Sequence, residues 1–314
     1  MQATATQTIA IDPELAHSVH GVAAHSSEHA PAACLNCGTL VADRFCGHCG
    51  QDVHHTHRLT LRFLLLHDLP HSIWHVDKGI GYTFRQMMTR PGATLHEYMA
   101  GRRAQHFRPI SYLLLICAVC MLLLSAVGMN PMAASQQADM PRLLQLTMER
   151  YLQLYTKYPT LIYVVLLPGN ALLATWLLRP ARFNFAEMLL SQAFISGTTT
   201  VISTVVMLPM MLLIPYFPVL QQYLVLGMLP FTVYTAWVYR QLLEPARLSV
   251  GAKWARSIGT VVLQTILLFA SIMLVYVAII ASLIRQDPTL LKDFQQRRAP
   301  TSAASHAPTP QPAR

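Results

Sequence analysis

The sequence predicts a mainly α-helical, polytopic membrane protein of about five spans with a small N-terminal CxxC…CxxC zinc ribbon. Of its 314 residues, 53% are hydrophobic and only 12% are charged, which is about half the charge of an ordinary soluble domain. The mean hydropathy is +0.38, although an excess of Lys and Arg still gives a net charge of +9. This composition excludes a soluble globular enzyme, a disordered chain and a disulfide-rich secreted module.

Both ends of the chain have the composition of disordered tails. The first residues are rich in Ala, Thr, Ser and His, and no basic stretch precedes an apolar one there, so we expect no secretory signal peptide. The changes of composition along the chain predict five segments. They are 1–33 (disordered tail), 34–53 (zinc ribbon), 58–109 (basic amphiphilic helical segment), 110–284 (transmembrane helical domain) and 285–314 (C-terminal tail, disordered from about 299).

Two CxxCG motifs predict a metal site. Cys34 and Cys37 form the first motif, and Cys46 and Cys49 form the second. Zinc prefers four soft ligands in a tetrahedron, and the two-residue gap lets each pair supply one edge. Because four thiolates leave no position open for water, we expect a structural zinc ion. Disulfides are disfavoured because the ribbon is assigned to the reducing cytoplasm, and His48 is expected to stay outside the ligand set.

The residues around the cysteines indicate how the ribbon folds and what it contacts. Gly38 and Gly50 follow the second cysteine of each motif and permit a positive φ, which turns backbone N–H groups toward the thiolates. Residues 34–50 hold one basic residue, Arg44, and one acidic residue, Asp43. Since phosphate binding requires a basic surface, we expect no nucleic acid and favour a protein partner on the cytosolic side.

The segment 58–109 alternates short helical patterns with glycine and proline breaks. Its mixture of basic, aromatic and aliphatic residues favours helices lying in the membrane interface, and a small cytosolic helical subdomain is the alternative. Thr94 and Glu97 form a capping-box pattern that predicts a helix start, with Gly101 as its stop. The basic residues next to the first span are expected to contact anionic lipid headgroups or to act as a plain topology signal. They are Arg102, Arg103 and Arg108.

Three histidines precede the first span at intervals of four residues. His67, His71 and His75, with Asp77 nearby, could bind a second metal or take part in acid–base chemistry if one helix carried them all. Pro70 favours a helix that begins near that position, which would leave His67 outside it. We prefer the alternative in which these histidines are interfacial or hydrogen-bonded side chains.

Five long stretches free of charged residues predict the membrane spans. About 20 apolar residues cross a bilayer as a helix, so four stretches are long enough and the fourth, which contains Pro230, is a short span or part of a re-entrant hairpin. We interpret the polar groups inside the second, third and fifth stretches as residues that kink a helix or form hydrogen bonds between helices. The stretches are Ile110–Met129, Thr160–Leu178, Met188–Ile214, Tyr223–Tyr239 and Ile258–Ile284, and the polar groups include Asn170, Gln192 and Gln264.

The distribution of Lys and Arg predicts the orientation of the spans. Residues 58–108 carry eight such residues, and the four loops between the spans then carry three, two, none and four. This alternation assigns the N-terminus and the even loops to the cytoplasm. The C-terminal tail disagrees, because five spans place it outside although it carries five Lys or Arg residues. Four or six spans therefore remain alternatives.

Short motifs follow one another in the first third of the chain. They are the four ribbon cysteines with Cys49-Gly50-Gln51, Arg58-Leu59-Thr60, Asp77-Lys78-Gly79, Thr83, Arg90-Pro91-Gly92, Tyr98, Gly101-Arg102-Arg103 and Pro109. In this order they resemble the bacterial domain-of-unknown-function 3667 family, which implies a bacterial inner membrane. The resemblance covers about residues 34–125 and implies an N-terminal zinc ribbon followed by transmembrane helices. It implies no activity, substrate or catalytic residue.

These features favour a non-enzymatic integral membrane protein whose structural zinc ribbon serves protein interaction or scaffolding. A transporter or channel-like protein is one alternative, but the spans lack the ionisable residues that usually mark a transport path. A membrane-interface metal-dependent enzyme that uses His67, His71 and His75 is the other alternative. No catalytic residue is predicted.

Overall fold

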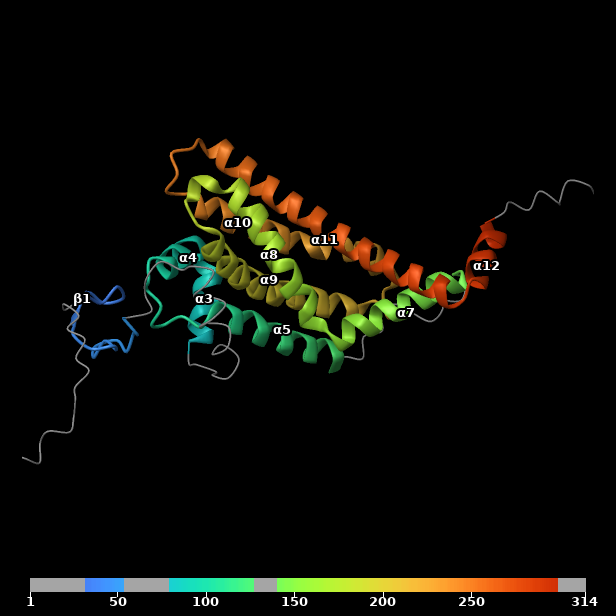
Figure 1. The fold of residues 1–314 in the computed structure, drawn as a ribbon, viewed down its shortest axis with the longest axis horizontal. Coiled ribbons are helices and arrows are strands. Elements are labelled where there is room, and N and C mark those ends of the chain that lie inside the picture. Colours follow the sequence, from blue (N-terminus) through green and yellow to red (C-terminus); the bar gives the residue numbers. More distant parts are fainter. Residues whose placement is uncertain (1–31, 54–78, 127–139, 299–314) are drawn as a thin grey trace, which may run out of the picture. The chain divides into compact units, whose positions relative to one another are not determined.

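The computed structural model describes residues 32–53, 79–126 and 140–298 of the chain (Figure 1). The chain divides into two compact units, Met1–His55 and Thr56–Arg314. The first unit contains the cysteine motifs and the second is helical, so the described residues are mainly helical, as the composition predicts.

A two-stranded antiparallel sheet opens the first unit. Strand β1 (Ala32–Ala33) pairs with strand β2 (Leu40–Val41), with Ala32 opposite Val41. The sequence assigned Ala32 and Ala33 to the disordered tail, which is wrong because their backbone groups complete the hairpin. The remainder of the predicted tails, residues 1–31 and 299–314, lies outside the described residues.

Two short helices begin the described part of the second unit. Helix α3 (Ile80–Thr89) is followed directly by α4 (Pro91–Met99). Pro91 occupies the first turn of α4, where its fixed φ suits a helix and its missing N–H costs no hydrogen bond. The two helices lie within the segment for which a basic amphiphilic helical region was predicted.

The predicted start of α4 at a Thr94–Glu97 capping box is wrong. The helix begins three residues earlier, at Pro91, and the Thr94 hydroxyl donates to the carbonyl oxygen of Arg90 at 2.9 Å. Thr94 is therefore in the second turn, where it cannot cap a helix N-terminus. The predicted stop is confirmed, because the chain leaves the helix at Ala100 and Gly101 has a φ of 97°.

Long apolar helices pack side by side in the second unit (Figure 1). Helix α9 contacts α5, α8 and α10, and α11 packs against α8 and α10. Helices α5, α9 and α11 begin, and α8 and α10 end, at the same end of this bundle, next to α3 and α4. We name this the α4 end. The bounds are α5 (Pro109–Ala126), α8 (Pro159–Leu177), α9 (Phe185–Leu213), α10 (Leu229–Leu242) and α11 (Val250–Gln286).

Helix α9 is the buried element of the bundle. Its N-terminal half is buried nearly all round, which is the pattern of a central helix. Asn184 and Glu187 form a reciprocal capping box at its start, with the Glu187 carboxylate accepting from Asn184 N at 2.8 Å. Gly197 allows the ring of Tyr112 on α5 to approach closely, and the Tyr112 hydroxyl lies 3.0 Å from the Thr198 hydroxyl.

A separate cluster forms at the opposite end of the bundle. Helix α7 (Arg142–Lys157) packs against the C-terminal part of α11, and α12 (Thr289–Arg298) follows α11 (Figure 1). Leu143, Leu283 and Leu290, one from each helix, are buried together. The sequence predicted neither α7 nor this cluster, because α7 is amphipathic and carries charged residues.

Two of the described helices are long and apolar enough to cross a membrane, α9 and α11. At 1.5 Å per residue they extend about 43 Å and about 55 Å, against a hydrocarbon thickness of about 30 Å. The segments Pro109–Leu124 and Val165–Leu177 are shorter apolar helices. The predicted fourth stretch, Tyr223–Tyr239, is divided between a 3₁₀ segment, η4 (Pro218–Met228), and the 14-residue α10. Five spans are therefore not confirmed.

Uncharged polar side chains link the helices inside the bundle, as was inferred for Gln192 and Gln264. The Tyr239 hydroxyl on α10 accepts from Gln192 Nε2 on α9 at 2.8 Å and donates to Gln264 Oε1 on α11 at 2.8 Å. Gln264 Nε2 donates in turn to the carbonyl oxygen of Asn170 on α8 at 3.0 Å. One chain of hydrogen bonds thus joins four helices.

Helix α4 is held against the C-terminal end of α10. The backbone N–H of Gly92 donates to Gln241 Oε1 at 2.9 Å, and His96 Nε2 lies 3.2 Å from the carbonyl oxygen of Leu242. A Cβ atom added at Gly92 would lie 2.3 Å from Gln241 Cβ, so no other residue fits without a shift of α4. The Tyr234 hydroxyl adds a hydrogen bond to the carbonyl oxygen of Met87 at 2.8 Å.

Replacing Gly92 by alanine should separate α4 from α10. We expect Gly92→Ala to lower the free energy of unfolding by about 1–3 kcal/mol, because overpacked sites must displace backbone or side chains. Gly81→Ala is the matched control, since a Cβ at Gly81 on α3 meets nothing within 4 Å and should change stability by less than about 1 kcal/mol. Chemical denaturation in detergent micelles measures both. Equal effects of the two substitutions would contradict the contact.

Candidate metal centre

The two cysteine motifs fold into matching turns. In the first, Gly38 N donates to Cys34 O at 2.8 Å and Cys34 N donates to Thr39 O at 2.9 Å. In the second, Gly50 N donates to Cys46 O at 2.8 Å, and Cys46 N donates to the carbonyl oxygen of Gln51 at 2.9 Å. The φ angles of Gly38 and Gly50 are 79° and 73°, which confirms the positive values that the sequence predicted.

These turns bring the four thiol groups together. The Sγ atoms of Cys34 and Cys49 lie 3.6 Å apart, and those of Cys37 and Cys46 lie 3.5 Å apart. All four Sγ atoms are within 4.8 Å of one another. A tetrahedron with metal–sulfur bonds of about 2.3 Å has edges of about 3.8 Å, so the cluster has the size of a four-thiolate metal site. All four thiols are free rather than paired in disulfides.

The surroundings of the thiols differ across the cluster. Cys34 and Cys46 are buried, Cys49 is half-buried and Cys37 is exposed. Hydrogen bonding to the Thr39 side chain and backbone lowers the pKa of Cys37 to about 6, whereas desolvation raises the pKa of Cys49 to about 11. A thiolate at Cys37 near neutral pH gives the cluster a first anionic ligand for a cation. Metal binding would then displace the protons of the remaining thiols.

The donor set determines what a bound metal could do. Four sulfur ligands complete a tetrahedral coordination shell and leave no open position for a reacting water. His48 is exposed and is not among the four residues whose ligand atoms converge, in agreement with its predicted place outside the ligand set. The arrangement is that of a structural metal centre, which could hold the ribbon together.

The ribbon also has a surface that the sequence did not reveal. Leu35, Leu40 and Phe45 are exposed and do not contribute to the small core of this unit. Arg44 lies over the Phe45 ring at 5.2 Å and forms an ion pair with Asp52 at 3.1 Å. The charge of this arginine is therefore neutralised locally. Alternation of apolar and polar residues could have indicated these exposed side chains, but the segments are too short for a periodic pattern.

The other predicted site residues fall into two groups. His67, His71, His75 and Asp77 lie outside the described residues. Arg102 and Arg108 are exposed beside the start of α5, and the half-buried Arg103 donates through Nε to Tyr98 O at 3.1 Å. Contact of these arginines with lipid headgroups stays a prediction.

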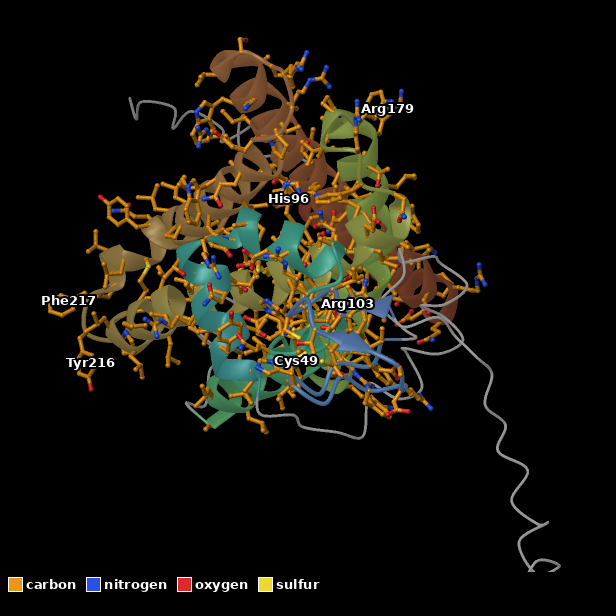
Figure 2. The ribbon with its side chains drawn as sticks, turned by 90° about the vertical axis from the view of Figure 1, so that its left-hand side faces the viewer. Cys49, His96, Arg103, Arg179, Tyr216 and Phe217 are labelled. Atoms are coloured by element: carbon orange, nitrogen blue, oxygen red, sulfur yellow. The ribbon has the colours of Figure 1, made fainter. Side chains whose placement is uncertain are left out.

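Two histidines at the α4 end of the bundle escaped the sequence analysis. Burial lowers the pKa of His96 and of His106, so both are neutral at pH 7. The His96 ring packs on Phe183, with centroids 5.0 Å apart, and His106 packs on Tyr82 and Tyr98. Figure 2 shows His96 near the middle of this end of the helical unit, and its side chain is half-buried. Both rings thus pack against aromatic side chains, and His96 also contacts the carbonyl oxygen of Leu242.

These features define a mainly helical protein that has candidate membrane-spanning helices and a four-cysteine cluster able to hold a metal ion. Residues 77–121 match the family described as "Protein of unknown function (DUF3667)". This match confirms the family resemblance over α3, α4 and most of α5. No curated protein and no solved structure gives a significant match to the chain.

The cluster predicts a simple metal stoichiometry. Purified protein should contain about one metal ion per chain, and Cys37→Ser should remove it, because a three-thiolate site is incomplete. Elemental mass spectrometry of the full chain measures the metal. Cys120→Ala, which removes a buried thiol from α5, is the control and should leave the metal content unchanged. Equal metal content in wild type and Cys37→Ser would contradict the site.

Proposed function

We propose that the protein is a non-enzymatic protein of the bacterial inner membrane whose zinc-stabilised ribbon binds a protein partner on the cytosolic side. The observation that carries this proposal is the distribution of side chains in the ribbon. Its four cysteines face one another, whereas Leu35, Leu40 and Phe45 are 49%, 73% and 55% exposed. A unit that turns its ligands inward and its large apolar side chains outward has the surface of a binding module.

The size of the ribbon explains the need for a metal. Its buried core consists of Cys34, Val41 and Cys46, with Cys49 and Val53 packed against them. So few apolar contacts do not offset the conformational entropy of about 20 ordered residues. Zinc binding contributes folding free energy directly in domains of this kind, and a four-thiolate site suits zinc. The metal thus frees the apolar side chains from forming a core and leaves them available to a partner.

The helical unit supports membrane insertion. Side chains along one face of α11 are apolar and exposed, which suits contact with lipid; they are Val262, Ile266, Phe269, Met273 and Val277. Tyr216 and Phe217 project outward beyond the end of α9 (Figure 2), as aromatic side chains do at a membrane interface. The α4 end carries Arg179, Arg247 and Arg256, and basic residues at that end favour its placement in the cytoplasm.

The partner surface can be tested with a photo-crosslinking residue at Leu40 in the full chain. Crosslinking in native membranes should give one product of defined mass, whose partner is identified and then titrated as a purified protein. Phe45→Ala should weaken that binding by about tenfold or more, because exposed aromatic side chains dominate the energy of interfaces. Asp43→Asn, an exposed change in the same ribbon, should leave binding unchanged. Equal binding by the two variants would remove the ribbon surface from the proposal.

The orientation can be tested by cysteine labelling in intact cells. An impermeant maleimide should label Glu149→Cys on α7 and should not label Arg247→Cys at the α4 end until the cells are permeabilised. Both positions are exposed, so burial does not confound the comparison. The unsubstituted chain gives the background from native thiols. Labelling of Arg247→Cys in intact cells would reverse the proposed orientation.

A further inference from the structure

An open groove runs along the last two turns of α8 and past its end. It has a volume of about 480 Å³, and its lining is mostly apolar. The residues that line it are Leu172, Leu173, Thr175, Trp176, Arg179 and Phe183. The groove lies in the helical unit and is distinct from the cysteine cluster of the ribbon.

The lining changes from apolar to basic along the helix. Leu172 and Trp176 lie four residues apart on one face of α8, and Arg179 follows in the 3₁₀ segment η3 (Arg179–Ala181) at the α4 end of the bundle. Leu172 is 62% exposed and Trp176 is 56% exposed. The Thr175 hydroxyl donates to the carbonyl oxygen of Ala171 on its own helix at 2.7 Å, so the hydroxyl is satisfied there. These side chains therefore form an apolar surface next to the guanidinium group of Arg179.

The far wall of the groove is held in place from α4. The Phe183 ring packs on the His96 ring, and His96 in turn lies against the carbonyl oxygen of Leu242. Since burial lowers the pKa of His96, its ring is neutral at pH 7 and adds no charge to the groove. The wall is thus apolar, and Arg179 supplies the charge of the lining.

Arg179 is available to an anion. It is exposed, and it forms no ion pair with any acidic residue of the described segments. The carboxylate of Glu187, in the next helix, accepts from Asn184 N in the capping box of α9. Arg256 donates to the carbonyl oxygen of Leu177 at 2.9 Å and so adds a second positive charge near the end of α8. Figure 2 shows Arg179 at the margin of the helical unit, pointing away from it.

We infer that this groove binds one anionic phospholipid, with an acyl chain along Leu172 and Trp176 and the phosphate at Arg179. The order of the lining matches the order of the lipid, since hydrocarbon lies at the depth of the helix and the charged headgroup lies at its end. A tryptophan between the two occupies the depth that indole rings prefer at an interface. A soluble phosphate compound would leave the apolar part of the groove uncovered. The inference rests on the proposed membrane insertion of the helical unit.

Trp176 provides a local reporter for this lipid. The full chain is reconstituted in phosphatidylcholine bilayers that contain a fixed minor fraction of one brominated lipid. In one sample this lipid is phosphatidylglycerol with brominated acyl chains, and in the other it is phosphatidylcholine with brominated acyl chains. The Trp176 signal is the difference in fluorescence between the chain and its Trp176→Phe variant, so the other tryptophans stay in place. Quenching of Trp176 by brominated phosphatidylglycerol should correspond to a local concentration about fivefold above that of brominated phosphatidylcholine. This is the preference that one arginine near an anionic headgroup provides.

Charge substitutions separate a specific site from a general basic surface. Arg179→Gln should bring quenching by the brominated phosphatidylglycerol down to the phosphatidylcholine level. Arg247→Gln removes the same charge at the same end of the bundle, outside the groove, and should keep the preference. An excess of glycerol 3-phosphate should not reduce quenching.

Four results would overturn the inference. The first is equal quenching by the two brominated lipids, which leaves membrane insertion intact but gives no lipid preference. The second is loss of the preference in Arg247→Gln, which indicates a diffuse charge effect, and the third is competition by glycerol 3-phosphate, which indicates a phosphate site. Absence of quenching by either lipid would reject both the groove and the membrane insertion on which it rests.

Discussion

The hydroxyl group of Tyr239 occupies the point where α9, α10 and α11 meet, and the carbonyl oxygen of Asn170 extends the same chain of hydrogen bonds to α8. Inside an apolar environment each of these groups needs a partner within the protein, because water is not there to supply one. A hydroxyl donates a single hydrogen, so the two glutamine amides must be oriented to match it. Rotation of any of these helices would break at least one bond. The chain of hydrogen bonds therefore fixes the relative rotation of these helices.

The two units of the protein satisfy different requirements. The ribbon has too few apolar contacts to fold on its own hydrophobic core, and four thiol groups within 4.8 Å of one another offer a metal as the substitute. The helical unit has an extended core that includes Tyr112, Phe194 and Tyr239. Its exposed surface also carries many large apolar side chains, which suits the proposed contact with lipid.

Local patterns were predicted well from the sequence, and contacts between distant residues were not. The convergence of four cysteines and the positive φ of Gly38 and Gly50 depend on residues within two short motifs. The contact between Gly92 and Gln241 joins residues 149 positions apart, and no local pattern announces it. Thr94 and Glu97 match the residue pattern of a capping box, but the backbone preference of Pro91 determines where α4 begins. Counting apolar residues located the long helices, but it could not show that the stretch Tyr223–Tyr239 changes from 3₁₀ to α-helical geometry at its first third.

Helix α11 is 37 residues long, and its length has a mechanical consequence. Near its start Lys253 donates to the carbonyl oxygen of Glu244, and near its end Leu283 is buried against residues of α7 and α12. A straight helix of this length, about 55 Å, acts as a stiff lever: a tilt of about 5° at one end displaces the other end by about 5 Å. A displacement of that size exceeds the tolerance of side-chain packing around Leu143 and Leu290. In the proposed membrane insertion, α11 would therefore transmit movement at one side of the membrane to the other as a single rigid element, without any change in the fold of the neighbouring helices.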